Sequence, residues 1–129
     1  MTKTYIPVAL KQAVIERALE HCEYCLSPSA YSPEIFELEH VQPVAAGGKT
    51  EFSNLAFACP ACNRYKSDRQ FVADLDTGEI VPLFDPRTQI WREHFQWSTD
   101  LLMVEGLTQI GRSTVFALNM NRKSALGFR

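Results

Sequence analysis

The residues best suited to chemistry are Glu39, His40, Asn54 and Asn63, in the stretch FELEHVQPVAAGGKTEFSNLAFACPACNRYKS (36–67). Glu39 and His40 are adjacent in a segment that alternates like a strand, so their side chains should point to opposite faces. Two such groups can flank a phosphate. One holds a cation at the departing oxygen, and the other removes a proton from water on the far side. Histidine suits the second task because its usual pKa of about 6.5 leaves it mostly neutral near pH 7.

The pattern of these residues therefore indicates hydrolysis of a phosphodiester. A simpler interpretation makes Glu39 a solvent-exposed carboxylate at a strand end and His40 an ordinary histidine. For the adjacent pair taken alone, this simpler interpretation is the stronger one. The surrounding motifs decide between the two.

Four cysteines form two Cys-x-x-Cys pairs, Cys22 with Cys25 and Cys59 with Cys62. The two-residue gap lets both thiolates of a pair turn toward one cation, and two pairs complete a tetrahedral zinc site. A redox motif of the thioredoxin type would need only one pair, and it would lie near a βαβ unit that we do not find. Because four thiolates fill the coordination sphere, we expect this zinc to be structural.

The composition is that of one globular domain: 129 residues, 46% hydrophobic and 22% charged. A net charge of −2 argues against coating nucleic acid through bulk charge, so any such contact must be local. Residues 1–21 lack an apolar run typical of a signal peptide, and no later segment suits a membrane span. We expect a cytoplasmic protein, where paired cysteines more often bind metal than form disulfides.

The expected secondary structure places these motifs on short elements. In the first half the sequence predicts a helix over 7–20, strands over 35–41 and 54–58, and a short helix after Cys59. In the second half it predicts a turn at 76–78, a helix from Asp85 through Phe95, a hairpin of 95–97 with 102–104, and a final helix over 108–121. Periodic apolar residues, proline at first helical positions and turn residues are the signals used.

In this order the motifs resemble those of the HNH endonucleases with a zinc-bound ββα-metal core. The resemblance is carried by Glu39-His40, Pro43, Gly47-Gly48, Asn54-Leu55, Ala58-Cys59, Cys62-Asn63 and Lys66. The core motif spans 22–67. The segments LFDPR, WREHFQW and GLTQIGRSTVFALNMNR in 68–129 resemble the extension of one bacterial branch of that family. The implied fold is α+β: a ββα core stapled by a four-cysteine zinc site, with flanking helices and a C-terminal hairpin, in one domain over 1–129.

The resemblance also implies a role for each matching residue. His40 would be the general base, and Asn54 would fix the loop and orient the histidine. Glu39 and Asn63 would hold a catalytic divalent ion. Their oxygen donors suit Mg²⁺ or Mn²⁺. His40, Asn54 and Asn63 together form an H-N-N variant of the family's three-residue signature. Two departures are Glu39 in place of the commoner aspartate and Ser67 where some members have another metal-binding histidine.

Basic residues follow the motif, and we expect Lys66 and Arg64 to bind substrate phosphates. For Arg64, a position on the solvated surface is a nearly equal alternative. His94 lies among aromatic residues and is expected to be packed rather than catalytic.

The sequence thus predicts an HNH endonuclease that hydrolyses double-stranded DNA. Because a single ββα site attacks one strand, we expect nicking. The alternative is a catalytically inactive, zinc-stapled module that binds nucleic acid or protein. The mild net negative charge favours that alternative slightly. The set of Glu39, His40, Asn54 and Asn63 counts against it, since a binding module has no need of these residues.

Overall fold

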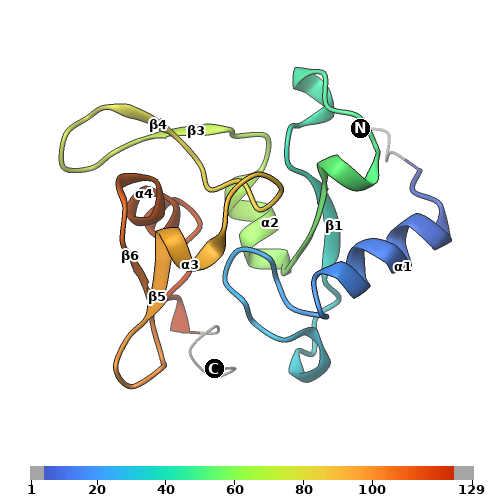
Figure 1. The fold of residues 1–129 in the computed structure, drawn as a ribbon, viewed down its shortest axis with the longest axis horizontal. Coiled ribbons are helices and arrows are strands. Elements are labelled where there is room, and N and C mark those ends of the chain that lie inside the picture. The colour runs from blue at the N-terminus through green and yellow to red at the C-terminus, as the bar shows by residue number, and fades with distance from the viewer. Residues whose placement is uncertain (1–4, 124–129) are drawn as a thin grey trace.

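The computed structural model describes residues 5–123 and contains, within them, four α-helices and six short strands (Figure 1). The helices are α1 (Val8–Arg17), α2 (Pro60–Lys66), α3 (Trp91–His94) and α4 (Gln109–Ala117). The strands are β1 (Glu37–His40), β2 (Leu55–Ala58), β3 (Phe71–Ala73), β4 (Ile80–Pro82), β5 (Phe95–Trp97) and β6 (Val104–Gly106). Each strand pairs antiparallel with its neighbour in sequence, β1 with β2, β3 with β4, and β5 with β6. The fold class is α+β, as predicted.

The order of β1, β2 and α2 confirms the predicted succession of two strands and a short helix. In the β1–β2 ribbon Glu37 is opposite Ala58 and His40 is opposite Leu55. Every residue of β2 is buried, which explains its wholly apolar sequence. Helix α2 starts where the sequence predicts, because the Cys59 sulfur accepts a hydrogen bond from the Cys62 amide and proline occupies the first helical position.

Several predicted boundaries differ from the structure. The first helix ends at Arg17 rather than Glu20, because Leu19 and Glu20 adopt positive φ angles of 54° and 58°. The final helix ends at Ala117. Strand β6 begins at Val104, so the predicted hairpin forms with its second strand shifted toward the C-terminus. Strands β3 and β4 were not predicted, although the turn predicted at 76–78 lies in the connection between them.

The predicted helix from Asp85 through Phe95 is wrong. The Asp85 carboxylate does accept a hydrogen bond from the Arg87 amide at 2.8 Å, as a helix cap would, but it caps only a turn. Ile90 then adopts extended angles, φ −100° and ψ 125°, and α3 starts after it. The sequence predicts that Asp85 caps a helix, but its carboxylate caps only a turn.

One hydrophobic core cluster contains residues from both halves of the described chain, from Val14 of α1 to Met120 after α4. The Trp91 indole donates to the backbone carbonyl of Tyr24 at 2.8 Å, and the rings of Phe84 and Phe95 lie 5.0 Å apart. In Figure 1, α1 and β1 lie to the right, the C-terminal elements lie to the left, and α2 lies between them.

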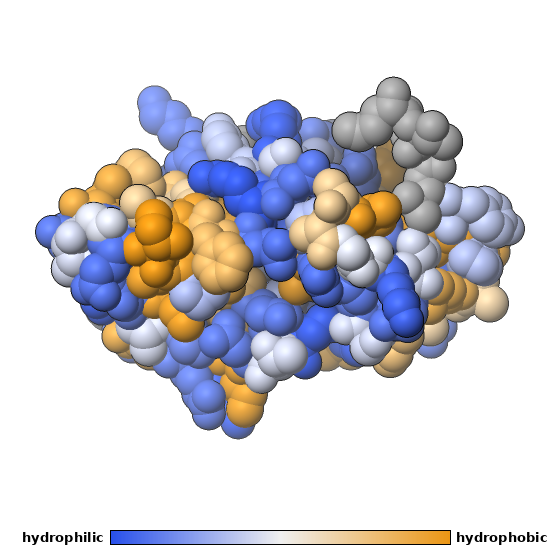
Figure 2. Space-filling model, turned by 90° about the horizontal axis from the view of Figure 1, so that it is seen from above, coloured by the Kyte–Doolittle hydropathy of each residue, from blue (hydrophilic) through white to orange (hydrophobic). Residues whose placement is uncertain are grey.

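The surface in Figure 2 has a hydrophilic band across the middle of the face shown and apolar side chains toward its left end. The β3–β4 hairpin lies toward the left in Figure 1, and its exposed apolar residues are Phe71, Leu75 and Ile80. Among the described residues, no helix combines the length and apolar character that crossing a membrane requires.

Candidate active site and metal centre

The four cysteines come together as predicted. Cys22 and Cys25 lie in the turns between α1 and β1, and Cys59 and Cys62 lie at the start of α2. All four are free and buried, and their sulfur atoms lie within 4.8 Å of one another. The sulfurs of Cys25 and Cys59 are 3.8 Å apart. A tetrahedral zinc site with bonds of about 2.3 Å has sulfur–sulfur edges of about 3.8 Å. The donor set therefore fits a structural zinc ion.

Hydrogen bonds to the sulfurs further support a metal centre. The amide of Cys25 donates to the Cys22 sulfur at 3.5 Å, and that of Cys62 donates to the Cys59 sulfur at 3.4 Å. The guanidinium of Arg122 also donates to the Cys59 sulfur, at 3.2 Å. Such donors offset the negative charge of thiolates. The contact from Arg122 was not predicted, because nothing local in the sequence links it to the cysteines.

Glu39 lies on the inner side of β1 and is only 5% exposed. One carboxylate oxygen accepts a hydrogen bond from the hydroxyl of Tyr24, and the other forms an ion pair with Lys66 at 3.0 Å. Burial raises the pKa of Glu39, whereas Lys66 and the hydrogen bond from Tyr24 act in the opposite direction. Tyr24 is fully buried, and burial beside Glu39 raises its pKa, so it remains a neutral donor.

Lys66 is 2% exposed, and its ammonium lies inside the protein rather than on the surface. Besides Glu39, it donates to the backbone carbonyls of His40 at 3.3 Å and Val41 at 3.2 Å. These contacts join the last turn of α2 to the end of β1. The predicted contact of Lys66 with phosphate stays a prediction, and in this structure protein groups surround the ammonium.

His40 follows Glu39 on β1, and the two side chains have different partners. Its Nε2 atom shares a hydrogen bond of 2.8 Å with the Thr50 hydroxyl. The side chain is partly buried, and burial together with the nearby Lys66 lowers the pKa of His40 below its ordinary value. The imidazole is therefore neutral near pH 7, the form in which it can accept a proton.

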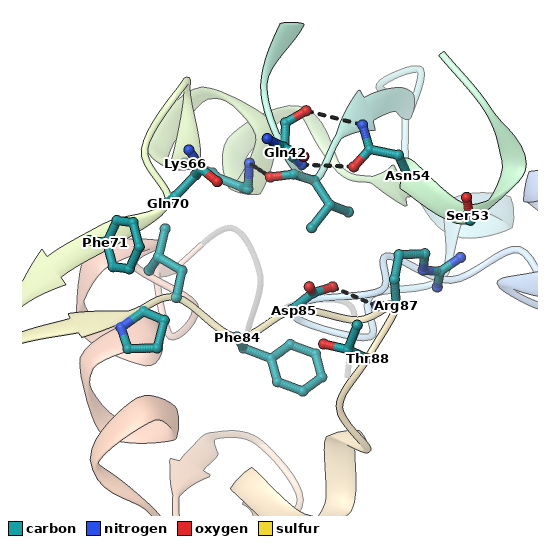
Figure 3. A pocket seen from close by; sticks show the side chains of 13 residues that line it. Gln42, Ser53, Asn54, Lys66, Gln70, Phe71, Phe84, Asp85, Arg87 and Thr88 are labelled. Carbon is teal, nitrogen blue, oxygen red and sulfur yellow. Dashed lines mark hydrogen bonds between the residues drawn. The ribbon is translucent and has the colours of Figure 1, made fainter. Parts of the chain in front are cut away.

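Asn54 is tied to the loop that follows β1. Its oxygen accepts from the Gln42 amide at 2.9 Å, and its nitrogen donates to the Gln42 carbonyl at 3.0 Å (Figure 3). The same nitrogen also donates to the Lys49 carbonyl at 2.9 Å. Gly48 is required in this loop, because a β-carbon there would lie 1.8 Å from the Gln42 carbonyl oxygen. Asn54 also lines the pocket of Figure 3, whose volume is about 310 Å³.

Asn63 faces β1 from α2, and its amide nitrogen donates to the carboxylate of Glu37 at 2.8 Å. A pocket of about 710 Å³ is lined by Glu39, His40 and Asn63, together with Arg64 and other residues. The structure thus brings four of the predicted site residues around one hollow, whereas Asn54 acts on the adjoining loop. The Arg64 side chain is exposed at this pocket, 5.4 Å from the ring centre of Tyr65.

Sequence reasoning did not single out Glu37, Tyr24 or Thr50. Glu37 could have been predicted from the sequence, because it stands two residues before Glu39 and therefore lies on the same face of the strand. Tyr24 and Thr50 had none, since their contacts join segments far apart in sequence. His94 is packed against Phe84, with ring centres 5.8 Å apart, and its Nδ1 atom is hydrogen-bonded to a threonine hydroxyl at 2.7 Å.

Comparison with protein families gives a match for the segment that holds these residues. Residues 22–69 match the family model of the HNH endonucleases. This segment is therefore similar to the HNH endonuclease domain. The matched range contains both cysteine pairs and ends just after α2, and a comparison with curated proteins found no match. The match supports a nuclease-type function in general, and the cysteine cluster within the matched range indicates a structural zinc site.

The zinc site can be tested by metal analysis. We expect about one zinc per chain in freshly purified, reduced protein, because metal binding by such sites is coupled to folding. Cys59→Ser should lose the zinc and unfold at a much lower temperature. Ala61→Ser adds a hydroxyl in the same helical turn without removing a sulfur, and it should keep both. Zinc-free wild-type protein with an intact thermal transition would contradict the assignment.

The buried ion pair generates a second prediction. Lys66→Met should cost about 3–5 kcal/mol, because it leaves the charge of Glu39 buried without its partner. The double variant Lys66→Met with Glu39→Gln should be more stable than Lys66→Met alone, since no unpaired charge remains. Denaturant unfolding of the wild type, both single variants and the double variant measures the coupling. A double variant no more stable than Lys66→Met would show that the pair is not coupled.

The loop contacts of Asn54 give a third prediction. Asn54→Ala should destabilise the protein by about 1 kcal/mol, because backbone groups of Gln42 and Lys49 lose their partner. The Gln42 amide should then exchange its hydrogen faster. Asn54→Asp is the matched variant: its carboxylate still accepts from that amide but cannot donate to the two carbonyls. Unchanged exchange at Gln42 in Asn54→Ala would refute this role.

Proposed function

We propose that this protein is a metal-dependent HNH endonuclease that hydrolyses phosphodiester bonds of double-stranded DNA and nicks one strand. The observation that carries the proposal is the pocket lined by Glu39, His40 and Asn63 within a segment that matches the HNH family. A neutral histidine and oxygen donors around one hollow are the groups that such a reaction needs.

In this proposal His40 is the general base. Its lowered pKa keeps the imidazole unprotonated near neutral pH. The hydrogen bond between Nε2 and Thr50 holds the ring, so that Nδ1 is the nitrogen available to a water molecule. Asn54 supports this arrangement indirectly, because it fastens the loop between β1 and Thr50.

Glu39 and Asn63 are the proposed ligands of a divalent ion, Mg²⁺ or Mn²⁺. Each carboxylate oxygen has two lone pairs, so the contacts of Glu39 with Tyr24 and Lys66 leave acceptor capacity on both oxygens. When bound, such an ion would polarise the phosphate and stabilise the departing oxygen. With few protein ligands it would bind weakly in the absence of DNA.

Substrate contacts would be local, in keeping with the net charge of −2. Arg64 is exposed at the pocket, and we propose that it contacts a phosphate. Lys66 lines the pocket of Figure 3 rather than the candidate pocket, and we propose that its positive charge acts on the substrate from there. One such site per chain attacks one strand, which is why we propose nicking.

A plasmid assay tests the proposed function. Wild-type protein should convert supercoiled plasmid to the nicked circle when Mg²⁺ or Mn²⁺ is added, and zinc alone should not replace them. His40→Ala should abolish nicking while zinc content and the thermal transition remain nearly unchanged. His21→Ala is the matched control, because it removes an exposed histidine outside the pocket.

Two results would contradict the proposal. An active His40→Ala protein would reassign the general base, and full activity with zinc alone would overturn the oxygen-ligated ion. If the wild type binds DNA in a gel-shift assay but does not nick it under any divalent ion, the protein is instead a zinc-stapled binding module. The assay therefore separates the two functions that the sequence left open.

A further inference from the structure

Glu37 lies on β1 beside the candidate site and contacts one of its residues, Asn63. It stands two residues before Glu39, so both side chains leave the strand on the face that α2 covers. Its carboxylate accepts the amide hydrogen of Asn63 at 2.8 Å, and unlike Glu39 it is exposed to solvent. A carboxylate in water and an amide are thus held together beside the pocket.

The two glutamates differ in the charge that they can offer a cation. The charge of Glu39 is balanced by Lys66 at 3.0 Å, and Asn63 is neutral. An ion held by those two residues would therefore meet little net negative charge. Glu37 is bonded to a neutral amide instead of an ammonium, so it keeps its negative charge available.

The hollows around β1 place Glu37 near the proposed base. Glu37 and His40 both line a pocket of about 700 Å³, and His40 and Asn63 both line the pocket of about 710 Å³. Glu37 and Asn63, one from each lining, are hydrogen-bonded to each other at 2.8 Å. His40 thus lines both hollows, Glu37 lines one, and its hydrogen-bond partner Asn63 lines the other.

We propose that Glu37 is a further ligand of the divalent ion, which it binds together with Asn63. This inference rests on the proposed nuclease function, because that function is what requires the ion. Rotation of the Asn63 amide by half a turn exchanges its nitrogen and oxygen. The amide oxygen and the Glu37 carboxylate then face the same space, where a hard cation such as Mg²⁺ or Mn²⁺ offsets their repulsion.

The test uses the full-length, zinc-loaded protein and Mn²⁺ as the probe. Binding of Mn²⁺ is measured by electron paramagnetic resonance, and plasmid nicking is measured across a Mg²⁺ titration at constant ionic strength. Glu37→Gln keeps an acceptor for the Asn63 amide but removes the charge, so it separates a ligand from a residue that only positions Asn63. Asp68→Asn removes an exposed carboxylate from the wall of the pocket that Asn63 lines, and it controls for bulk charge.

We expect Glu37→Gln to weaken Mn²⁺ binding by about tenfold or more and to raise the Mg²⁺ concentration needed for nicking, without changing zinc content or thermal stability. Asp68→Asn should change either value only slightly. Equal Mn²⁺ binding by Glu37→Gln and wild type would overturn the proposal, as would equal losses in Glu37→Gln and Asp68→Asn. If the wild type binds Mn²⁺ through Glu37 but does not nick DNA, the ion site stands and the nuclease function fails.

Discussion

The buried ion pair between Glu39 and Lys66 fixes the geometry on which the candidate site depends. Removing two charges from water is costly, and such a pair is tolerated only when its remaining hydrogen-bonding groups are also satisfied. Here Tyr24 bonds the carboxylate, and the carbonyls of His40 and Val41 bond the ammonium. Because the pair joins β1 to the last turn of α2, it also sets Asn63 against Glu37.

The thiol cluster constrains the other end of the same helix. Helix α2 has seven residues, too few for a helix to be stable on its own in water. Cys59 caps its start and Cys62 lies within its first turns, so a zinc ion would fasten this end to the turn that carries Cys22 and Cys25. Arg122 bonds the Cys59 sulfur and links the C-terminal segment to the centre. The cysteines would thus hold the start of α2 through zinc, and the ion pair of Lys66 with Glu39 holds its end. Asn63 lies between these two points.

The parts of the fold that the sequence predicted are those set by local signals. Paired cysteines, the Cys59-Pro60 helix start and the two short strands of the core need only neighbouring residues to be recognised. The partner of Glu39 could not be predicted, because pairing with Lys66 depends on how α2 packs against β1. The capping signal at Asp85 failed for a related reason: a turn satisfied it, and the extended Ile90 ended the segment before a helix could grow.

The balance of charges in the site links the proposed ion to the proposed substrate. Lys66 neutralises Glu39, and the exposed Asp68 and Arg64 at the pocket offset each other, so the protein alone offers a divalent ion little net negative charge beyond that of Glu37. A phosphate in the same pocket would supply the missing negative charge, and the ion would in turn neutralise the phosphate. Each would then raise the affinity for the other by the same factor, as thermodynamic linkage requires. Such coupling reconciles a mildly acidic protein with a DNA substrate, because the attraction arises only where the ion and a phosphate meet between β1 and α2.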